Sequence, residues 1–420
     1  MIMERCIVLN KQLNLVDKNK KLLGTFSLNE KAPIHRWFNF SEGYSNQFIK
    51  QELSLIEQEV KSIYDPFSGT GTTPLVASKN GIKSYYSETN PFMAFVCDTK
   101  INTSFSTEEE KEQIIEQLEM LLENIKLPTN IQCNSTATNI DYDGFEKYFD
   151  LKALYKLLTI KRIIKETCIV DRSRNLALLA LASITVKNSK MIRRGDLRFA
   201  NEKEIQKKEF NVFHDFEDKI KVMISDLINQ NDVSEKTHFI SEDARNAVFP
   251  EKIDCVITSP PYLNGTNYIR NTKLELKLLD FIQTEKDLPN LHSKGIMAGI
   301  NGVSKRRKIP FILEEIRPYL ERLEPVSYDR RIPIMISGYF YDMNIVIKQL
   351  SNNLNEDGIF ILDIGDSQFA GVHIPTHDVL KSLAEKHGFR LYDEEILRTR
   401  RSKNQMILSQ RVLRFKLEKN

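Results

Sequence analysis

The chain has 420 residues, 41% hydrophobic and 28% charged, which is the composition of an ordinary globular protein. Its 60 basic and 57 acidic residues give a net charge of +3, so total charge provides no argument for nucleic-acid binding, and any such surface must come from local clusters. The length indicates one large domain with insertions, or two domains.

Cysteine and histidine usage excludes several classes of protein. The five cysteines are scattered and form no C-x-x-C pair, which argues against a disulfide framework or a structural zinc site and fits a reducing cytoplasm. The histidines show no metal-ligand spacing, so we expect no metal. We find no apolar stretch of membrane-spanning length and no signal peptide, and therefore expect a cytoplasmic protein with no membrane partner.

The first predicted elements are those of an α/β sheet. A helical stretch at 45–60 leads into a short strand at 62–65, and a Gly-rich turn precedes a helix at 73–79. A second strand at 82–87 ends in an acidic turn. This order of strand, Gly-rich loop, helix, strand and acid predicts a doubly wound, Rossmann-like α/β fold.

The rest of the chain divides into a helical insertion, a resumed α/β pattern and a loose basic segment. Further strands are predicted at 237–240, 253–257, 358–364, 390–397 and 410–416, and helices at 338–354 and 376–386. The predicted units are the first half of the core (1–100), a mainly helical insertion (101–235), the second half of the core (236–283), a basic irregular segment (284–335) and the C-terminal part of the core (336–420).

The Gly-rich loop reads Asp65-Pro66-Phe67-Ser68-Gly69-Thr70-Gly71-Thr72-Thr73 and lies between a predicted strand and a predicted helix. Glycines there let the backbone approach a ligand closely, and the free N–H groups of the helix N-terminus can bind the carboxylate of an amino-acid moiety. The loop is not a phosphate loop, because no Lys follows its second glycine, and it lacks the third glycine of the dinucleotide fingerprint. An ordinary tight turn is the alternative.

Two acidic residues follow later strands. Glu88 stands where a carboxylate accepts both hydroxyls of a ribose in nucleotide-binding α/β folds. Asp243 could accept a hydrogen bond from an adenine amino group. The alternatives are a solvated loop residue for Glu88 and a helix N-cap before Ala244-Arg245 for Asp243.

The strongest signal is Ser259-Pro260-Pro261-Tyr262, directly after an apolar strand. Two prolines there fix a rigid turn at the carboxyl edge of the sheet, where open α/β sheets bind ligands. The exocyclic amine of a base is a poor nucleophile, so a side chain and a backbone carbonyl that accept its hydrogens would direct its lone pair toward a methyl donor. Ser259 and the Pro260 carbonyl can accept, and Tyr262 can stack on an extruded base. An incidental Pro-Pro turn is the alternative.

These segments resemble a known family. Asp65 to Thr73 resembles the cofactor-binding motif of DNA amino-methyltransferases, and Ser259 to Tyr262 resembles their catalytic motif in the form typical of cytosine-N4 enzymes, since adenine-N6 enzymes more often carry Asp or Asn at the Ser259 position. His35 to Phe40 is similar to the remaining cofactor-side motif of the family. Residues 101–235 match no motif of the family.

The resemblance implies an S-adenosylmethionine-dependent enzyme. It implies that cofactor is bound by Asp65, Pro66, Phe67, Ser68, Gly69, Gly71, Thr72, Glu88, Asn90 and Asp243, and that catalysis rests on Ser259, Pro260, Pro261 and Tyr262. The expected reaction is methyl transfer to cytosine N4 in a specific sequence of double-stranded DNA, within a restriction–modification system that could include a cognate endonuclease. Adenine-N6 methylation, RNA base methylation and a non-catalytic binding module stay open.

Three basic clusters could contact nucleic acid: 187–198, which includes Arg193 and Arg194; Lys305-Arg306-Arg307-Lys308; and 398–403. We expect contacts from Arg193, Arg194, Lys305, Arg306 and Arg307. The segment 284–335 is the favoured DNA-contacting element, and the helical insertion is the competing choice for target recognition. A solvated face is the alternative for each cluster.

Overall fold

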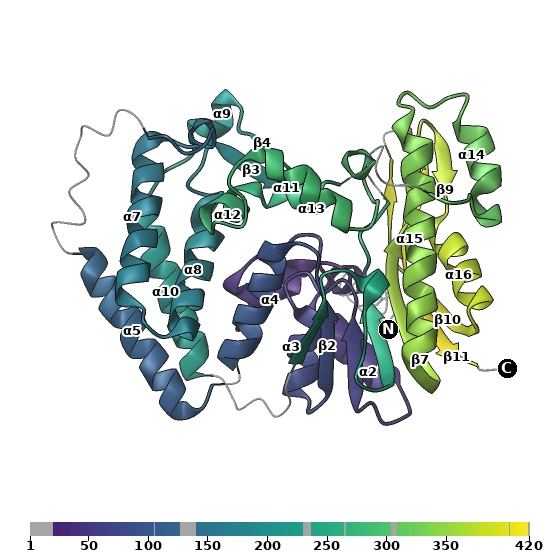
Figure 1. The fold of residues 1–420 in the computed structure, drawn as a ribbon, viewed down its shortest axis with the longest axis horizontal. Helices are drawn as coiled ribbons and strands as arrows, with labels where there is room; N and C mark the ends of the chain where they lie inside the picture. Colours follow the sequence, from purple (N-terminus) through teal and green to yellow (C-terminus); the bar gives the residue numbers. More distant parts are fainter. Residues whose placement is uncertain are drawn as a thin grey trace, which may run out of the picture.

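A seven-stranded sheet forms the centre of the molecule in the computed structural model, which describes residues 20–104, 106–126, 140–229, 237–263, 266–303, 309–402 and 404–418 (Figure 1). Its strand order is β10-β11-β7-β6-β1-β2-β5. The strands are β1 (Ser62–Asp65), β2 (Lys83–Ser87), β5 (Thr237–Ser241), β6 (Ile253–Thr258), β7 (Leu354–Gly365), β10 (Phe389–Arg401) and β11 (Ile407–Leu417).

The direction of the strands identifies the fold. The pairs β5–β2, β2–β1, β1–β6 and β6–β7 are parallel, whereas β11 is antiparallel to both β7 and β10. On one side of the sheet β2 and β5 follow β1 outward, whereas on the other side β7 follows β6 and the last strand, β11, lies between β7 and the edge strand β10. The predicted doubly wound, Rossmann-like methyltransferase sheet with a helical insertion is therefore confirmed.

Alternating side chains of the buried strands feed two hydrophobic cores, one on each face of the sheet. Ile63 of β1 joins the core under α2 (Asn46–Leu55) and α3 (Thr72–Lys79), and Tyr64 joins the core under α15 (Arg331–Asn353) and α16 (Thr376–Lys386). The helix α15 begins well before the predicted residue 338, because Pro333 lies in its first turn, where a missing N–H costs nothing.

The helical insertion packs on the sheet through α4 (Pro91–Ser104), whose Phe92 and Val96 share one core with the inserted helices. Those helices are α5 (Glu108–Lys126), α7 (Leu151–Thr167), α8 (Asp171–Thr185), α9 (Glu202–Ile205) and α10 (Val212–Ile228). A hairpin of β3 (Met191–Arg194) and β4 (Asp196–Phe199) interrupts them, and Gly195 at φ +75° provides its tight turn.

Short elements complete the chain. The remaining helices are α11 (Tyr268–Asn271), α12 (Lys273–Leu278), α13 (Leu288–Lys294) and α14 (Arg317–Leu323), and β8 (Ser367–Phe369) pairs with β9 (Val372–Ile374). The 3-10 turns are η1 (Phe26–Glu30), η2 (His35–Trp37), η3 (Glu146–Tyr148), η4 (Ala244–Asn246), η5 (Glu285–Asp287), η6 (Ile300–Gly302) and η7 (Glu314–Ile316). The predicted irregular segment 284–335 thus contains several short helical turns.

A buried carboxylate fastens the insertion to the start of the core. Asp226 on α10 is 2% exposed and accepts hydrogen bonds from the Ile34 backbone N–H (3.0 Å) and the Trp37 indole N–H (2.9 Å). The Arg36 guanidinium pairs with the same carboxylate at 2.5 Å. The insertion therefore fixes the course of residues 34–37, which lead directly into the functional site described below.

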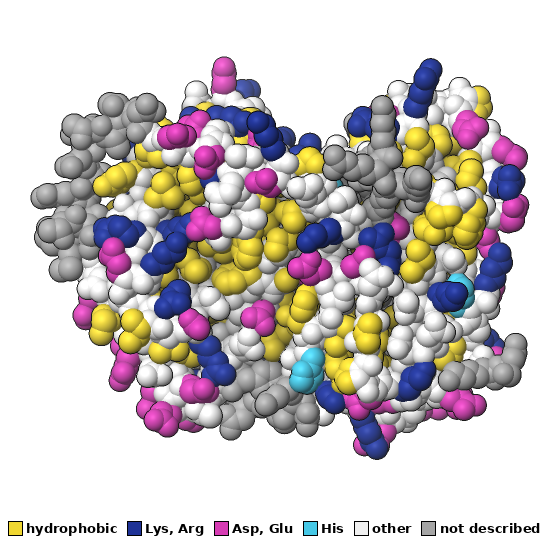
Figure 2. All heavy atoms as spheres, viewed as in Figure 1, with side chains coloured by type: hydrophobic (Ala, Val, Ile, Leu, Met, Phe, Trp, Pro, Cys, Tyr) yellow, Lys and Arg dark blue, Asp and Glu magenta, His cyan; other side chains and the backbone are white. Residues whose placement is uncertain are grey.

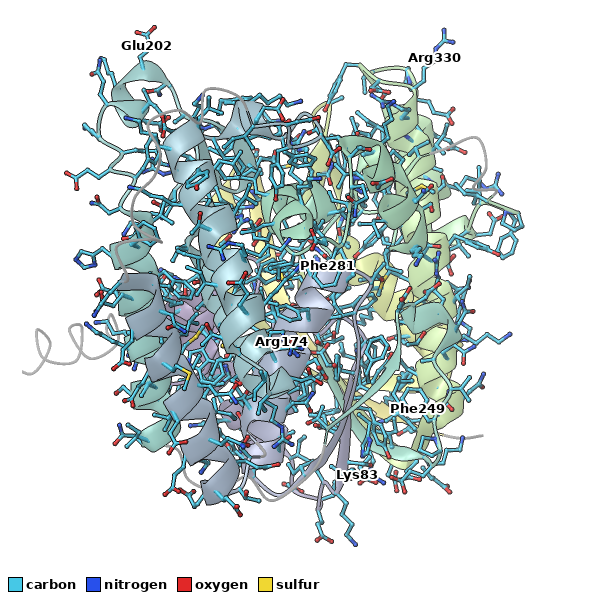
Figure 3. The ribbon with its side chains drawn as sticks, turned by 60° about the vertical axis from the view of Figure 1, so that its left-hand side comes forward. Lys83, Arg174, Glu202, Phe249, Phe281 and Arg330 are labelled. Atoms are coloured by element: carbon cyan, nitrogen blue, oxygen red, sulfur yellow. The ribbon has the colours of Figure 1, made fainter. Side chains whose placement is uncertain are left out.

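The two parts of the molecule leave a hollow between them. Figure 2 shows the upper edge indented between the helical insertion and the part formed by α14, β9 and α15, with Lys and Arg side chains along both rims. Glu202 and Arg330 stand at the two upper ends of the molecule, one on each side (Figure 3). Among the described residues, no helix has both the length and the apolar character needed to cross a bilayer.

A buried ion pair holds the antiparallel strand β11 against α2. The Arg414 guanidinium meets the Glu52 carboxylate at two points, both 2.7 Å, and these side chains are 3% and 1% exposed. We expect Arg414→Met to lower the free energy of unfolding by about 3–5 kcal/mol, because it leaves Glu52 buried and unpaired. Urea unfolding of the purified variant measures this.

The double variant Arg414→Met/Glu52→Leu should lose less stability than Arg414→Met alone, because it removes the stranded charge. Arg317→Met is the matched control, since Arg317 pairs with Glu314 on the exposed surface of α14 and should cost at most about 1 kcal/mol. Equal losses for the buried and exposed single variants would contradict this interpretation of the pair.

Candidate active site

A cavity of about 410 Å³ opens at the carboxyl ends of β1 and β6. The chain leaves β1 toward one edge of the sheet and leaves β6 toward the other, so this is the switch point at which open α/β sheets bind ligands. The Gly-rich loop ends at Thr73 and the Ser-Pro-Pro-Tyr turn begins at Ser259, 186 positions later. Both segments nevertheless line this one cavity.

The buried carboxylate of Asp65 joins the two motifs. Asp65 is 1% exposed and accepts hydrogen bonds from the Phe67 N–H (3.0 Å), the Thr258 hydroxyl (2.7 Å) and the Tyr44 phenol (2.9 Å). Phe67 belongs to the Gly-rich loop and Thr258 directly precedes Ser259. Burial raises the pKa of Asp65, and the three donors favour its ionised form. Asp65 thus supports the site from behind and does not line the cavity.

The two glycines of the loop serve different needs. Gly71 has φ +80° and caps α3, and a Cβ there would lie 2.6 Å from the Cys97 sulfur, so this glycine allows the loop to pack on α4. Gly69 has φ +54° and lines the cavity, where an added Cβ would lie 3.3 Å from the Phe40 ring. Gly71 is therefore a packing residue, whereas Gly69 presents backbone to the cavity.

Glu88 extends from the end of β2 into the cavity. Its carboxylate accepts hydrogen bonds from the Gly69 N–H (2.9 Å) and the Asn90 N–H (2.8 Å), and burial raises its pKa to about 7. Asn90 in turn donates its amide to the Thr272 hydroxyl at 2.9 Å. The acidic turn is thus attached both to the Gly-rich loop and to the segment that follows the Ser-Pro-Pro-Tyr turn.

The Ser-Pro-Pro-Tyr turn faces the same cavity with all four residues. The Tyr268 phenol oxygen accepts a hydrogen bond from the Tyr262 N–H at 3.0 Å, which fixes the end of the turn. Burial and the nearby carboxylate of the buried Asp363 on β7 raise the pKa of the Tyr262 phenol. Ser259, Pro260 and the ring of Tyr262 therefore have fixed positions beside the Gly-rich loop.

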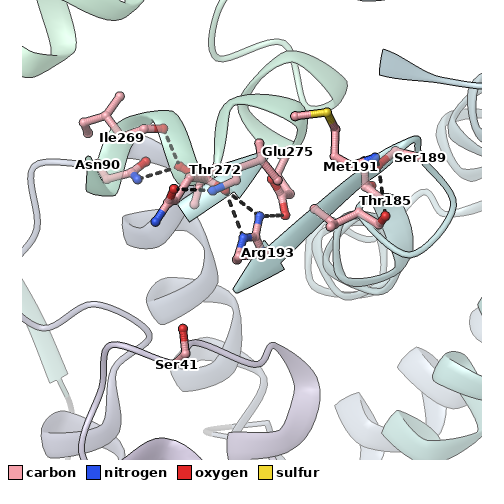
Figure 4. Close-up of polar contacts among 12 residues, drawn as sticks. Ser41, Asn90, Thr185, Ser189, Met191, Arg193, Ile269, Thr272 and Glu275 are labelled. Atoms are coloured by element: carbon pink, nitrogen blue, oxygen red, sulfur yellow. Dashed lines mark hydrogen bonds and ion pairs between the residues drawn. The ribbon is translucent and has the colours of Figure 1, made fainter. Parts of the chain in front are cut away.

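Arg193 has a structural partner inside the protein. It donates to the Asn271 carbonyl at 2.7 Å and pairs with Glu275, and its side chain is only 17% exposed (Figure 4). The Asn271 amide also donates to the Gly195 carbonyl at 2.7 Å, so the β3–β4 hairpin is bound to α11 and α12, with Gly195 at the cavity. These contacts hold the hairpin and leave Arg193 without the exposure expected of a phosphate contact, whereas Arg194 is exposed.

The expected site residues divide as follows. Those that line the cavity are Pro66, Phe67, Ser68, Gly69, Thr72, Glu88, Asn90, Ser259, Pro260, Pro261 and Tyr262. Asp243 is not among them: it caps η4 by accepting from the Arg245 N–H (3.0 Å) and pairs with the Arg245 side chain. Asp243 is thus the helix N-cap that the sequence offered as the alternative to a cofactor contact. Lys305, Arg306 and Arg307 lie outside the described residues.

Sequence reasoning missed several residues of the site. Tyr44, Tyr268 and Arg398 line the cavity, as do His292, Gly295, Gly299 and Asn301 of the segment after α12. Arg398 lies in the predicted basic cluster 398–403, and the last four residues lie in the segment 284–335, but no local pattern placed any of them at this cavity, because long-range folding brings them there. Within the described ranges, no group of three or more His, Cys, Asp or Glu side chains is arranged to hold a metal ion.

No family model matches the chain. It is similar to the Type II methyltransferase M.AvaI of Nostoc sp., with 26% identity over 92% of this chain and 85% of that protein. It is also similar to the Type II methyltransferase M.BsoBI of Geobacillus stearothermophilus, with 23% identity over 92% of this chain and 85% of the relative. The Type II methyltransferase M.MvaI of Kocuria varians is 23% identical over 90% of this chain and 88% of its own length. Over nearly its whole length, therefore, this chain is similar to Type II methyltransferases.

Proposed function

We propose that this protein is an S-adenosylmethionine-dependent DNA methyltransferase that acts on cytosine N4 in a specific duplex sequence, as part of a restriction–modification system. The observation that carries the proposal is the joining of the two motifs by Asp65 at one cavity. The Gly-rich loop and Glu88 form the cofactor end, and Ser259 to Tyr262 form the base end. The cytosine assignment rests on Ser259 and on the resemblance of its turn to cytosine-N4 enzymes.

The cofactor end fits S-adenosylmethionine by its donors and acceptors. The Glu88 carboxylate can accept the two ribose hydroxyls, and the backbone around Gly69 approaches the cavity without a side chain. The volume of about 410 Å³ lies within the range of small-molecule sites. When bound, this cofactor supplies the electrophilic methyl group.

The base end can prepare an exocyclic amine for that methyl group. Ser259 and the Pro260 carbonyl accept the two amine hydrogens, which directs the nitrogen lone pair toward the cofactor end. The Tyr262 ring stacks on the extruded base. Because Asp65 ties both ends together, the distance between amine and methyl donor is set by buried hydrogen bonds rather than by flexible loops.

The relatives support duplex DNA as the substrate and a restriction–modification context, with a cognate endonuclease as a partner, because they are Type II methyltransferases along nearly the full chain. The Lys and Arg side chains on both rims of the hollow could contact the phosphates of a duplex (Figure 2). Arg194, exposed in the hairpin next to Gly195, is a candidate phosphate contact. Adenine N6 is the second candidate acceptor, since both bases present the same kind of amine.

Replacement of Ser259 tests the catalytic assignment. We expect Ser259→Ala to bind S-adenosylhomocysteine as the wild type does but to lower kcat by about 10²–10³-fold, because an acceptor for the amine hydrogens is lost. Labelled-methyl transfer to duplex DNA and to transfer RNA measures turnover, and calorimetry measures cofactor binding.

Ser293→Ala, on the exposed side of α13, is the matched control and should keep wild-type turnover. Unchanged turnover in Ser259→Ala would remove the assigned role from this residue. Label appearing in transfer RNA and not in DNA would favour the RNA methyltransferase alternative.

Cofactor binding should depend on pH through Glu88. Its pKa is raised to about 7, so its ionised fraction falls as the pH drops below that value. Because only the carboxylate accepts from both ribose hydroxyls, the Kd for S-adenosylhomocysteine should rise toward about tenfold per pH unit below the pKa. Calorimetric titrations on both sides of about pH 7 measure this. Glu88→Gln should bind more weakly and lose the pH dependence; a pH dependence equal to the wild type in this variant would assign it to another group.

A further inference from the structure

A row of polar side chains runs across three neighbouring strands and ends beside Tyr262, which follows a fourth strand. Tyr262 follows β6, Asp363 lies in β7, Gln410 in β11 and Arg398 in β10, and these strands are neighbours in this order. The Gln410 amide donates to both Asp363 oxygens at 2.8 Å, and Arg398 Nε donates to the Gln410 amide oxygen at 2.6 Å. At the inner end of the row, burial raises the pKa of the Tyr262 phenol, and this phenol lies close enough to the Asp363 carboxylate for that charge to raise its pKa further.

The inner part of the row is buried, and both ends of the Gln410 amide are hydrogen-bonded. Asp363 is 1% and Gln410 5% exposed. The Gln410 amide nitrogen also donates to the Gly24 carbonyl at 3.2 Å, so its donor end faces Asp363 and Gly24 and its acceptor end faces Arg398. Burial raises the pKa of Asp363 to about 7, whereas the Tyr262 phenol and the Gln410 amide favour its ionised form.

The Tyr262 ring is confined on a second side. A Cβ added at Gly365 would lie 3.1 Å from two ring carbons, closer than an ordinary van der Waals contact, so the ring packs tightly on the backbone of β7 at this glycine. Asp363 near the phenol and Gly365 beside the ring together restrict Tyr262, which lines the cavity.

The outer end of the row carries a positive charge at the cavity. Arg398 lies opposite Gln410 in the β10–β11 ladder, next to a register shift between Ile396 and Arg398. Its side chain is exposed and lines the same cavity as Tyr262. A register shift of this kind re-aims a side chain, and here the guanidinium stands at the mouth of the base end.

We propose that Asp363 and Gln410 are positioning residues that hold the Tyr262 ring for stacking on the target base, and that Arg398 contacts a phosphate beside that base and ties the row to the bound nucleic acid. This inference rests on the proposed function, and it deepens that function by naming what orients the stacking ring. A phosphate oxygen suits Arg398, because this residue is exposed, lines the cavity, and has guanidinium donors besides the Nε that donates to Gln410.

A double-mutant cycle tests the hold on the ring. Asp363→Asn and Tyr262→Phe should each lower kcat on duplex DNA about tenfold with little change in the KM for the cofactor, the loss expected from one charge-assisted hydrogen bond. In the Tyr262→Phe background, Asp363→Asn should have at most about a twofold further effect, because its partner is already gone. DNA with 2-aminopurine at the target position should show a smaller fluorescence rise with either single variant.

If the wild type is active and the fall in kcat of the double variant equals the product of the two single falls, the positioning role is overturned and the proposed function stands. A wild type that transfers no methyl group to DNA would instead refute the proposed function. The melting temperatures of the same three variants test the interaction between Asp363 and Tyr262 independently of activity. The double variant should melt no lower than the less stable single variant. A fall in its melting temperature equal to the sum of the two single falls would overturn the positioning role.

Arg398→Gln tests the outer end. It should weaken DNA binding and lower the slope of log K against log salt by about one, while cofactor binding is unchanged. Arg390→Gln, at the far end of the same strand and paired with Glu418, is the matched control and should keep the wild-type slope. An unchanged slope in Arg398→Gln would overturn the phosphate contact.

Discussion

The hydrogen bonds of the buried Asp65 carboxylate set the distance between the two halves of the site. The Gly-rich loop follows β1 and the Ser-Pro-Pro-Tyr turn follows β6, and Asp65 binds the backbone of one and the Thr258 hydroxyl of the other. Tyr44 adds a third donor from the N-terminal segment. Since an unpaired buried carboxylate is costly, all three segments must close on Asp65 together, and the cavity forms between them.

The helical insertion contributes to the same site from outside the sheet. Asp226 fixes the segment that runs toward Phe40 and Tyr44, and Arg193 with Asn271 holds the β3–β4 hairpin at the cavity. The insertion thus shares its core with α3 and α4 and also shapes one wall of the cavity. We interpret the basic hollow beside it as the path of the DNA duplex (Figure 2).

The sequence predicted the parts of the site whose chemistry is local. The strand that ends at Asp65 and the doubly wound fold followed from apolar runs and Gly and Pro signals, and the structure confirms both. The role of Arg193 could not be predicted, because its partner Glu275 lies 82 residues away. The contact between Asp363 and Gln410 could not be predicted either, since polar side chains in apolar strands acquire partners only when the strands pair.

We propose that one cavity brings a methyl donor to a base amine and that Ser259 selects cytosine. Mass spectrometry of nucleosides from duplex DNA treated with the purified protein and S-adenosylmethionine tests this most directly. The account predicts N4-methylcytosine at one recurring sequence and none with Ser259→Ala. N6-methyladenine as the product would contradict the cytosine assignment, and unmodified DNA would contradict the proposed activity itself.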